Sequence, residues 1–150
     1  MTTVRTIRLL VVEDNPAYRY LIEKAFGDRV GQIHWALTVA VNGEEALHVL
    51  FEEENSNAPL PDIILLDWNL PKVSGGEVLQ RVKEHRQLRK IPILVLSSSD
   101  ADSDILTAYD NHANGYITKP WEIDALAAIV EAMERFWIAV QLPKVARSRD

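Results

Sequence analysis

Short apolar runs alternate along the chain with stretches whose apolar residues recur at helical spacing. The runs predict buried strands at residues 8–12, 33–39, 62–66 and 91–96, and a short fifth strand at 115–117. They are apolar without alternation, which is typical of parallel strands covered on both faces. The stretches between them predict helices at residues 16–26, 42–51, 77–85, 100–111 and 121–137. A strand is therefore followed by a helix five times.

This order of elements predicts an α/β fold in which an open five-stranded parallel sheet has helices on both faces. The strand order 2-1-3-4-5 is a common one for such sheets. Asn15 is expected to cap the first helix, with Pro16 at its first position, because proline lacks the N–H that would be unpaired there. Ser99 or Asp100 is expected to cap the fourth helix. In sheets of this class the functional site lies outside the carboxyl ends of the strands.

Candidate reactive side chains follow four of the predicted strands: Glu13 with Asp14, then Asp67, Ser97 and Lys119. Asp67 can act as a nucleophile toward a phosphoryl donor and form an aspartyl phosphate. Asp14 and Asp67 can hold Mg²⁺, which prefers one or two carboxylates plus phosphate oxygens, and Glu13 could bind it through a water. Lys119 can neutralise one phosphate oxygen, and Ser97 can donate a hydrogen bond to another.

Each of these side chains also has an ordinary structural explanation. Glu13 and Asp14 can simply open a helix, and Asp67 can end a strand. Ser97, with its two serine neighbours, can end a strand and cap a helix, and Lys119 can be a solvated lysine. The unusual feature is that all four places fall at the ends of strands in one parallel sheet.

The composition limits the alternatives. A length of 150 residues predicts one domain, and 47% hydrophobic with 25% charged residues is the balance of a soluble globular protein. The chain has no cysteine, which excludes disulfides and thiolate metal sites. A net charge of −6 argues against direct nucleic-acid binding. No apolar run approaches the roughly 20 residues of a membrane span, and no signal peptide is evident, so a cytoplasmic protein is expected.

Four stretches together carry a specific resemblance: Val11-Val-Glu-Asp-Asn15, Ile64-Leu-Leu-Asp-Trp-Asn-Leu-Pro71, Ile91-Pro-Ile-Leu-Val-Leu-Ser97 and Gly115-Tyr-Ile-Thr-Lys-Pro120. With them, the chain resembles the receiver domains of two-component response regulators from about residue 7 to residue 136. The resemblance implies the flavodoxin-like (βα)5 fold and a signalling protein rather than an enzyme. We expect a receiver domain at residues 1–137 and a C-terminal tail at 138–150.

The resemblance also implies roles for individual residues. Asp67 matches the aspartate that takes a phosphoryl group from a sensor histidine kinase. Asp14 and Asp67 match direct Mg²⁺ ligands, Glu13 matches an acid that organises the ion, and the backbone carbonyl of Asn69 would supply another ligand. Lys119 matches the lysine that contacts the phosphate.

A switch is implied by two further positions. Ser97 matches the switch hydroxyl, as a serine where threonine is commoner, and Tyr116 matches the switch aromatic. We expect Ser97 to move toward the phosphate and Tyr116 to turn into the space that this movement leaves, although an ordinary half-buried aromatic is the alternative for Tyr116. In the family the bond matching Lys119–Pro120 is usually cis, whereas X–Pro bonds in general are mostly trans.

The last predicted helix has two apolar faces where a helix that covers a sheet needs one. The first contains Ile123, Leu126, Ala127, Val130 and Met133, and the second contains Ala125, Ile129, Ala132, Phe136 and Val140. We expect a homodimer through the second face, and the alternative is that the C-terminal tail folds back over it. The tail is basic and is expected to be solvated.

Residues 111–120 and 135–143 are similar to those of a narrower group, the small response regulators paired with cyanobacterial phytochrome kinases. This similarity implies a light-sensing, phytochrome-type histidine kinase as the donor. It also implies a chain without an output domain, which would signal through a partner, a homodimer or a relay.

The sequence also bears on three other classes of function. A phosphatase with an aspartate nucleophile would carry a second acid two residues later, where this chain has Asn69. A binding module that no longer accepts phosphate would not need the full set of site residues. A flavin site is disfavoured because the loop from Glu13 to Pro16 offers acids and a proline where phosphate must bind.

Overall fold

The computed structural model describes residues 4–52 and 59–146. Five strands and five α-helices alternate along them, with a π-helical segment η1 (His48–Glu52) after α2 and a 3-10 turn η2 (Leu88–Lys90) after α3. The elements are β1 (Arg5–Val12), α1 (Pro16–Gly27), β2 (Ile33–Ala40), α2 (Gly43–Leu47), β3 (Ile63–Asp67), α3 (Gly75–Glu84), β4 (Ile93–Ser97), α4 (Asp102–Asp110), β5 (Gly115–Thr118) and α5 (Ile123–Ala139).

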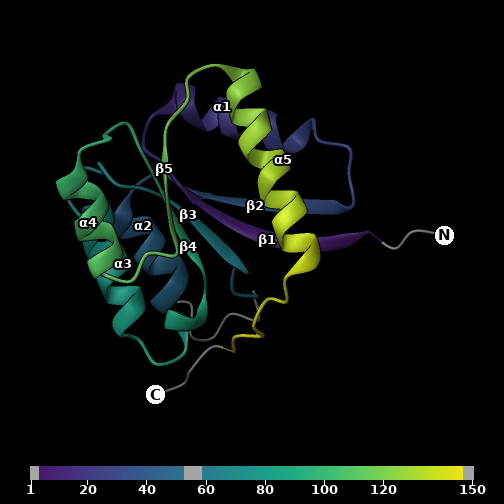
Figure 1. The fold of residues 1–150 in the computed structure, drawn as a ribbon. Helices are drawn as coiled ribbons and strands as arrows, with labels where there is room; N and C mark the ends of the chain where they lie inside the picture. Colours follow the sequence, from purple (N-terminus) through teal and green to yellow (C-terminus); the bar gives the residue numbers. More distant parts are fainter. Residues whose placement is uncertain (1–3, 53–58, 147–150) are drawn as a thin grey trace.

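The strands form one parallel sheet in the order β2-β1-β3-β4-β5, which confirms the predicted topology (Figure 1). The central strand β3 is buried at every position. Its neighbours β1 and β4 are mostly buried as well. This is why the strands read as apolar runs without alternation.

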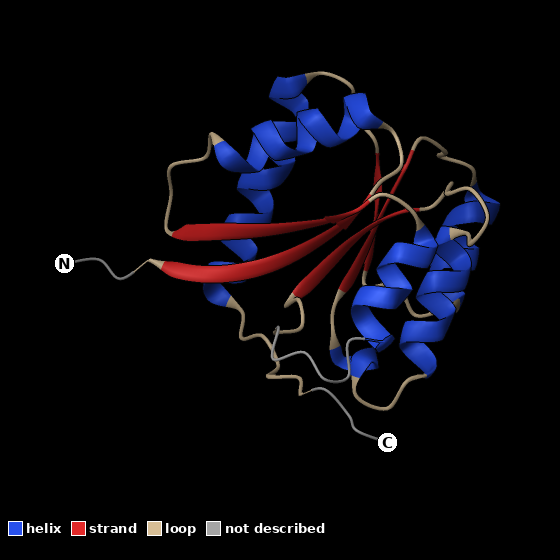
Figure 2. Cartoon of the chain, turned by 180° about the vertical axis from the view of Figure 1, so that it is seen from behind, coloured by secondary structure: helices blue, strands red, loops and turns tan. Residues whose placement is uncertain are grey.

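Helices cover both faces of the sheet. Helices α1 and α5 lie on one face, and α2, α3 and α4 lie on the other (Figures 1 and 2). Each face has its own apolar core, because successive strand residues point to opposite sides. In β1, for example, Leu9 and Val11 pack with α1 and α5, whereas Leu10 and Val12 pack with the other three helices.

Helix ends follow the sequence in some places and depart from it in others. The Asn15 side chain accepts hydrogen bonds from the N–H groups of Ala17 and Tyr18, so the predicted cap of α1 is confirmed. The predicted cap of α4 is wrong: the helix starts after Ala101, and no side chain caps it. The Ser99 hydroxyl instead donates a hydrogen bond to the Asp104 carboxylate.

The C-terminal end of α5 is fastened to the start of the sheet. The helix extends to Ala139, two residues beyond the predicted end, and the Arg5 guanidinium donates to the carbonyls of Trp137 and Val140. Val140 and Leu142 then pack against the core beneath α1 and α5, and Val145 packs against the other core. The first part of the tail is therefore packed rather than solvated as predicted.

Two sequence-based expectations lie wholly or partly outside the described residues. They are the polar loop between α2 and β3, of which residues 53–58 are not described, and the basic end of the tail at 147–150. Within the described part of the chain, no helix is long and apolar enough to cross a membrane.

Candidate functional site

Three acidic side chains meet at the carboxyl edge of the sheet. Glu13 and Asp14 follow β1, and Asp67 is the last residue of β3. One carboxylate oxygen from each lies within 4.8 Å of the others. Glu13 and Asp67 are 1% and 3% exposed, whereas Asp14 is exposed to solvent. The structure thus brings the three predicted acids into one cluster that is open on one side.

The register of the sheet explains this meeting. Val12 of β1 is paired with Leu66 of β3, so that Glu13 and Asp67 follow at the same level. The loops then orient both carboxylates. The N–H of Asn15 donates to Glu13 Oε2 at 3.2 Å, and the N–H of Asn69 donates to Asp67 Oδ1 at 3.1 Å.

Lys119 brings a positive charge into the cluster from the end of β5. Its Nζ lies 2.6 Å from Glu13 Oε1 and 3.4 Å from Asp67 Oδ2, and its side chain is buried. The N–H of Lys119 donates to the carbonyl of Ser97 at 2.7 Å, which continues the pairing of β5 with β4. The predicted lysine therefore contacts the predicted nucleophile directly.

Burial raises the pKa of Glu13 to about 7, and Asp67 adds to the rise while Lys119 opposes it. One lysine thus does not balance three neighbouring carboxylates. A bound divalent cation would offset the remaining repulsion. Oxygen donors from Glu13, Asp14 and Asp67 fit a hard cation such as Mg²⁺ rather than a soft transition metal.

Close packing beneath Asp67 depends on Gly75, the first residue of α3. A Cβ at this position would lie 2.3 Å from the Asp67 carbonyl oxygen, and the Gly75 N–H donates to the Trp68 carbonyl at 3.2 Å. Only a residue without a side chain allows α3 to start this close to β3. The predicted helix begins only at residue 77, so this role of Gly75 was not predicted from the sequence.

Both predicted switch residues are hydrogen-bonded to Ser99. The N–H of Ser99 donates to Ser97 Oγ at 3.1 Å, and the Tyr116 hydroxyl donates to the Ser99 carbonyl at 2.8 Å. The Ser99 hydroxyl in turn donates to Asp104 Oδ2 of α4 at 2.6 Å. Ser97 is fully buried and Tyr116 is half-buried.

Sequence reasoning missed Tyr18 of α1. Its ring lies against the Lys119 ammonium, with Nζ 4.7 Å from the ring centroid. The available signal was helical spacing, because Tyr18 lies four residues before Ile22 on the buried stripe of α1.

The expected cis bond is not found: the Lys119–Pro120 bond is trans, as are all peptide bonds of the described residues. Trans is the lower-energy form for X–Pro bonds in general.

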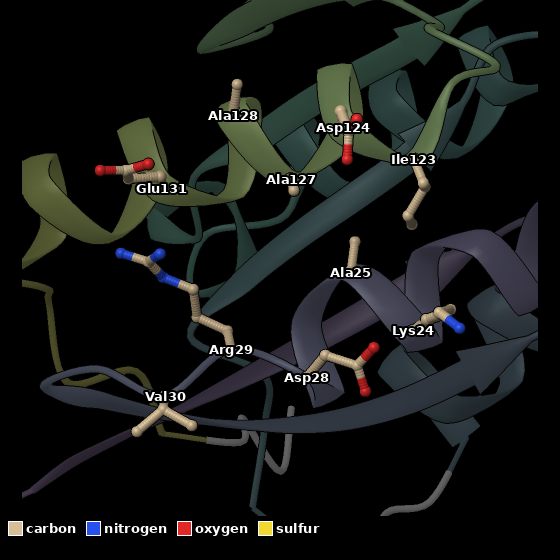
Figure 3. Close-up of a pocket in the computed structure, with 10 residues that line it drawn as sticks. All are labelled: Lys24, Ala25, Asp28, Arg29, Val30, Ile123, Asp124, Ala127, Ala128 and Glu131. Atoms are coloured by element: carbon tan, nitrogen blue, oxygen red, sulfur yellow. The ribbon is translucent and has the colours of Figure 1, made fainter.

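A hollow of about 350 Å³ lies between α1 and α5, apart from the acidic cluster (Figure 3). Its lining mixes apolar side chains with charges of both signs, and the Arg29 side chain extends across it toward α5. None of the predicted site residues lines it. The candidate site is therefore the open acidic edge of the sheet rather than this hollow.

Comparisons with known proteins agree with this fold. The response regulator receiver domain model matches residues 9–131. The chain is 41% identical over 133 residues to the probable methanogenesis regulatory protein FilR2 of Methanothrix harundinacea, covering 87% of this chain and 83% of that protein. It is 36% identical over 137 residues to the response regulator Rcp1 of Synechocystis sp., covering 90% and 92%.

Solved structures give the same result. The phosphorylated cyanobacterial phytochrome response regulator RcpA superposes with a TM-score of 0.83 at 39% identity, covering 92% of this chain and 99% of that one. The Mn²⁺-bound form of Rcp1 superposes with a TM-score of 0.79 at 36% identity, covering 91% and 99%. A family model that spans most of the sequence and relatives of nearly the same length place this chain in the response regulator receiver domain family.

Proposed function

We propose that this chain is a phosphorylation switch in which Asp67 accepts a phosphoryl group from a sensor histidine kinase. The observation that carries the proposal is the buried Asp67 carboxylate with Lys119 Nζ at 3.4 Å and two further acids within 4.8 Å. Nucleophile, counter-charge and cation ligands are thus gathered at one edge of the sheet.

Mg²⁺ would be held by Asp14, Asp67 and the backbone carbonyl of Asn69, with Glu13 organising it, and would supply positive charge beside the incoming phosphoryl group. In the transfer, an Asp67 carboxylate oxygen attacks phosphorus and the bond from phosphorus to the kinase imidazole nitrogen breaks. The imidazole leaves with the electron pair. Lys119 then neutralises a phosphoryl oxygen, because its ammonium already borders Asp67.

The chain acts as a signalling receiver rather than as a phosphatase with many turnovers. An enzyme of that kind protonates its leaving group with an acid close to the nucleophile. Asn69, two residues after Asp67, carries an amide that cannot do so. Its N–H instead donates to Asp67.

A phytochrome-type histidine kinase is the proposed donor. This rests on the similarity to RcpA, which is described as a cyanobacterial phytochrome response regulator, at 39% identity over nearly its whole length.

The proposed switch runs from Ser97 to Tyr116 through Ser99. When Ser97 Oγ turns to donate to the phosphoryl group, it leaves the N–H of Ser99 that it now accepts from. Ser99 then shifts, and the carbonyl that holds the Tyr116 hydroxyl shifts with it. The same movement pulls on Asp104 and changes the surface of α4 and β5.

A homodimer through the second face of α5 is also proposed. Phe136 on this face is 56% exposed, and an apolar groove of about 500 Å³ beside it is lined by residues of β4, β5 and α5. The competing occupant was the chain's own tail, whose Leu142 packs against the core beneath α1 and α5 while Phe136 stays exposed. A second copy of α5 offers the apolar side chains that this groove accepts.

The deciding experiment is intact mass after incubation with a small acyl phosphate and Mg²⁺. Wild type should gain the mass of one phosphoryl group, and Asp67→Asn should gain none. Asp62→Asn is the matched control, since Asp62 precedes the same strand and its side chain accepts from the N–H of Arg8. This variant should gain the group like wild type. Chelation of Mg²⁺ should prevent the gain.

A gain that persists in Asp67→Asn would contradict the assignment of the acceptor. No gain in wild type, even with a phosphorylated histidine kinase as donor, would contradict phosphorylation as the function. A gain that is independent of Mg²⁺ would remove the proposed metal site while leaving the acceptor in place.

A further inference from the structure

One buried tyrosine is in contact with three consecutive residues beside the site. Tyr18 of α1 is 0% exposed, and it meets the loop between β5 and α5 at residues 119–121. The Lys119 ammonium lies over its ring, 4.7 Å from the centroid. The Tyr18 hydroxyl donates to the Pro120 carbonyl at 2.8 Å. The Trp121 ring packs edge-on, with the centroids 4.8 Å apart and the planes at 75°.

These contacts differ in kind, so they fix different parts of the loop. The hydroxyl bond fixes the backbone that follows Lys119, and the Trp121 contact holds the next turn. The ring face attracts the ammonium itself, since a cation over a tyrosine ring is drawn to its negative face. No other aromatic ring is found over Lys119 Nζ among residues 4–52 and 59–146.

We propose that Tyr18 is a positioning residue for Lys119, whose ammonium it holds within reach of Asp67 for phosphoryl transfer. The proposal rests on the phosphorylation function proposed above. Through Tyr18, helix α1 would fix the position of the Lys119 ammonium that contacts the phosphoryl group.

The distances show why Lys119 needs such support. Its Nζ is 2.6 Å from Glu13 and 3.4 Å from Asp67, so the closer attraction draws it away from the nucleophile. The Tyr18 ring gives the ammonium a third favourable contact that does not come from an anion. A flexible lysine chain without this surface would sample more positions, and the phosphoryl group would meet a less localised charge.

The alternative is that Tyr18 only fills the core. A matched variant separates the two roles. Phe26 is a buried aromatic of the same helix and packs edge-on against Trp35, with the centroids 5.1 Å apart, away from Lys119. Tyr18→Leu and Phe26→Leu both remove a buried ring and an edge-on partner, but only the first removes the surface under Lys119. Tyr18→Phe keeps the ring and loses the hydroxyl.

The test is the rate constant for phosphorylation by a small acyl phosphate with Mg²⁺, followed by intact mass. Tyr18→Leu should slow the reaction by roughly three- to tenfold, the size expected of one cation–π contact. Phe26→Leu should react like wild type even though its melting temperature falls, and Tyr18→Phe should stay within about twofold of wild type. In a Lys119→Ala background, Tyr18→Leu should have no further effect, because coupled residues do not add.

Equal slowing in Phe26→Leu, or the same effect with and without Lys119, would overturn the proposal in favour of simple core filling. A second readout needs no variant: the ring should shift the Lys119 side-chain proton resonances upfield relative to those of exposed Lys72, and unshifted resonances would also overturn it. Wild type that accepts no phosphoryl group would sink the proposed function and this role together. If wild type is phosphorylated and Tyr18→Leu reacts at the same rate, the proposed function stands and only the role of Tyr18 is contradicted.

Discussion

Glu134 of α5 is a buried carboxylate outside the candidate site. Its oxygens accept from Arg29 Nε at 2.9 Å and from the N–H of Gln32 at 2.8 Å, so it ties α5 to the loop between α1 and β2. A Cβ on Gly31 would lie 1.9 Å from Glu134 Oε1, so this loop approaches the carboxylate closely. Burial favours a higher pKa for Glu134, but the hydrogen bonds from Arg29 and the loop lower it overall from the ordinary 4.5.

Glu134→Gln should therefore lower the free energy of unfolding by about 1–3 kcal/mol at pH 7, because the half-buried Arg29 guanidinium loses its anionic partner. A carboxyl group whose pKa is lowered in the folded state stabilises the fold at pH values above its ordinary pKa. This stabilisation disappears as the pH falls through the folded-state pKa. The difference between wild type and variant should thus shrink below about pH 4.5. Denaturant unfolding across this range measures it.

The control is Glu131→Gln, one turn earlier on α5, where an exposed carboxylate pairs with Arg135 at 2.9 Å. An exposed pair contributes little, so this change should alter stability by less than about 0.5 kcal/mol. An equal effect of both substitutions, or a difference that grows in acid, would contradict the role given to Glu134.

Residues of the site could be predicted where a reactive side chain directly follows a predicted strand. Glu13, Asp14, Asp67 and Lys119 follow predicted strands, and parallel strands deliver their ends to one edge. Tyr18 could not be assigned, because a tyrosine on a buried helical stripe is identical in pattern to any core aromatic. Its contact with Lys119 depends on where the loop after β5 lies relative to α1, which no local pattern specifies.

At the scale of elements, helix starts were predictable only where the chain follows a local rule. Asn15 and Pro16 satisfy such a rule, and α1 begins where they predict. Ser99 and Asp100 are equally good candidates for a cap, but Ser99 lies within contacts to Ser97, Tyr116 and Asp104. These contacts occupy Ser99, so α4 starts without a side-chain cap.

The segment between β4 and α4 also carries the prediction for the switch. Ser97→Ala should still be phosphorylated, but phosphorylation should no longer change amide hydrogen exchange in α4 and β5. The reason is that alanine cannot donate to the phosphoryl group, so nothing moves Ser99 and the Tyr116 hydroxyl bond is kept. Ser98→Ala, at the exposed neighbouring position, should respond like wild type.

Hydrogen exchange with and without phosphorylation separates the outcomes. If Ser97→Ala shows the same phosphorylation-dependent change as wild type, the link through Ser99 is not the route. If Ser98→Ala also loses the response, the loop as a whole rather than the Ser97 hydroxyl transmits the change.

For the whole molecule, the fold was predictable because apolar runs mark the strands and apolar residues at helical spacing mark the helices. Those patterns predict a single parallel sheet that is covered by helices on both faces, as observed. What the pattern did not decide was the second face of α5, since an apolar face can meet either the chain's own tail or another molecule. Val140 and Leu142 pack against the core, and Phe136 is still exposed. This favours contact of the second face with another molecule.

Phe136→Glu should therefore abolish the proposed dimer. In a symmetric pair each substitution counts twice, and each would bury a carboxylate against the apolar groove without a partner. A penalty of only about 3 kcal/mol in total weakens association by roughly a hundredfold.

Sedimentation equilibrium should show a single 17.0 kDa species for the variant and twice that mass for wild type. Tyr20→Glu, which places the same charge on an aromatic that is 63% exposed on α1, should stay dimeric. A monomeric wild type, or a Phe136→Glu variant that still dimerises, would show that the second face of α5 is not the interface.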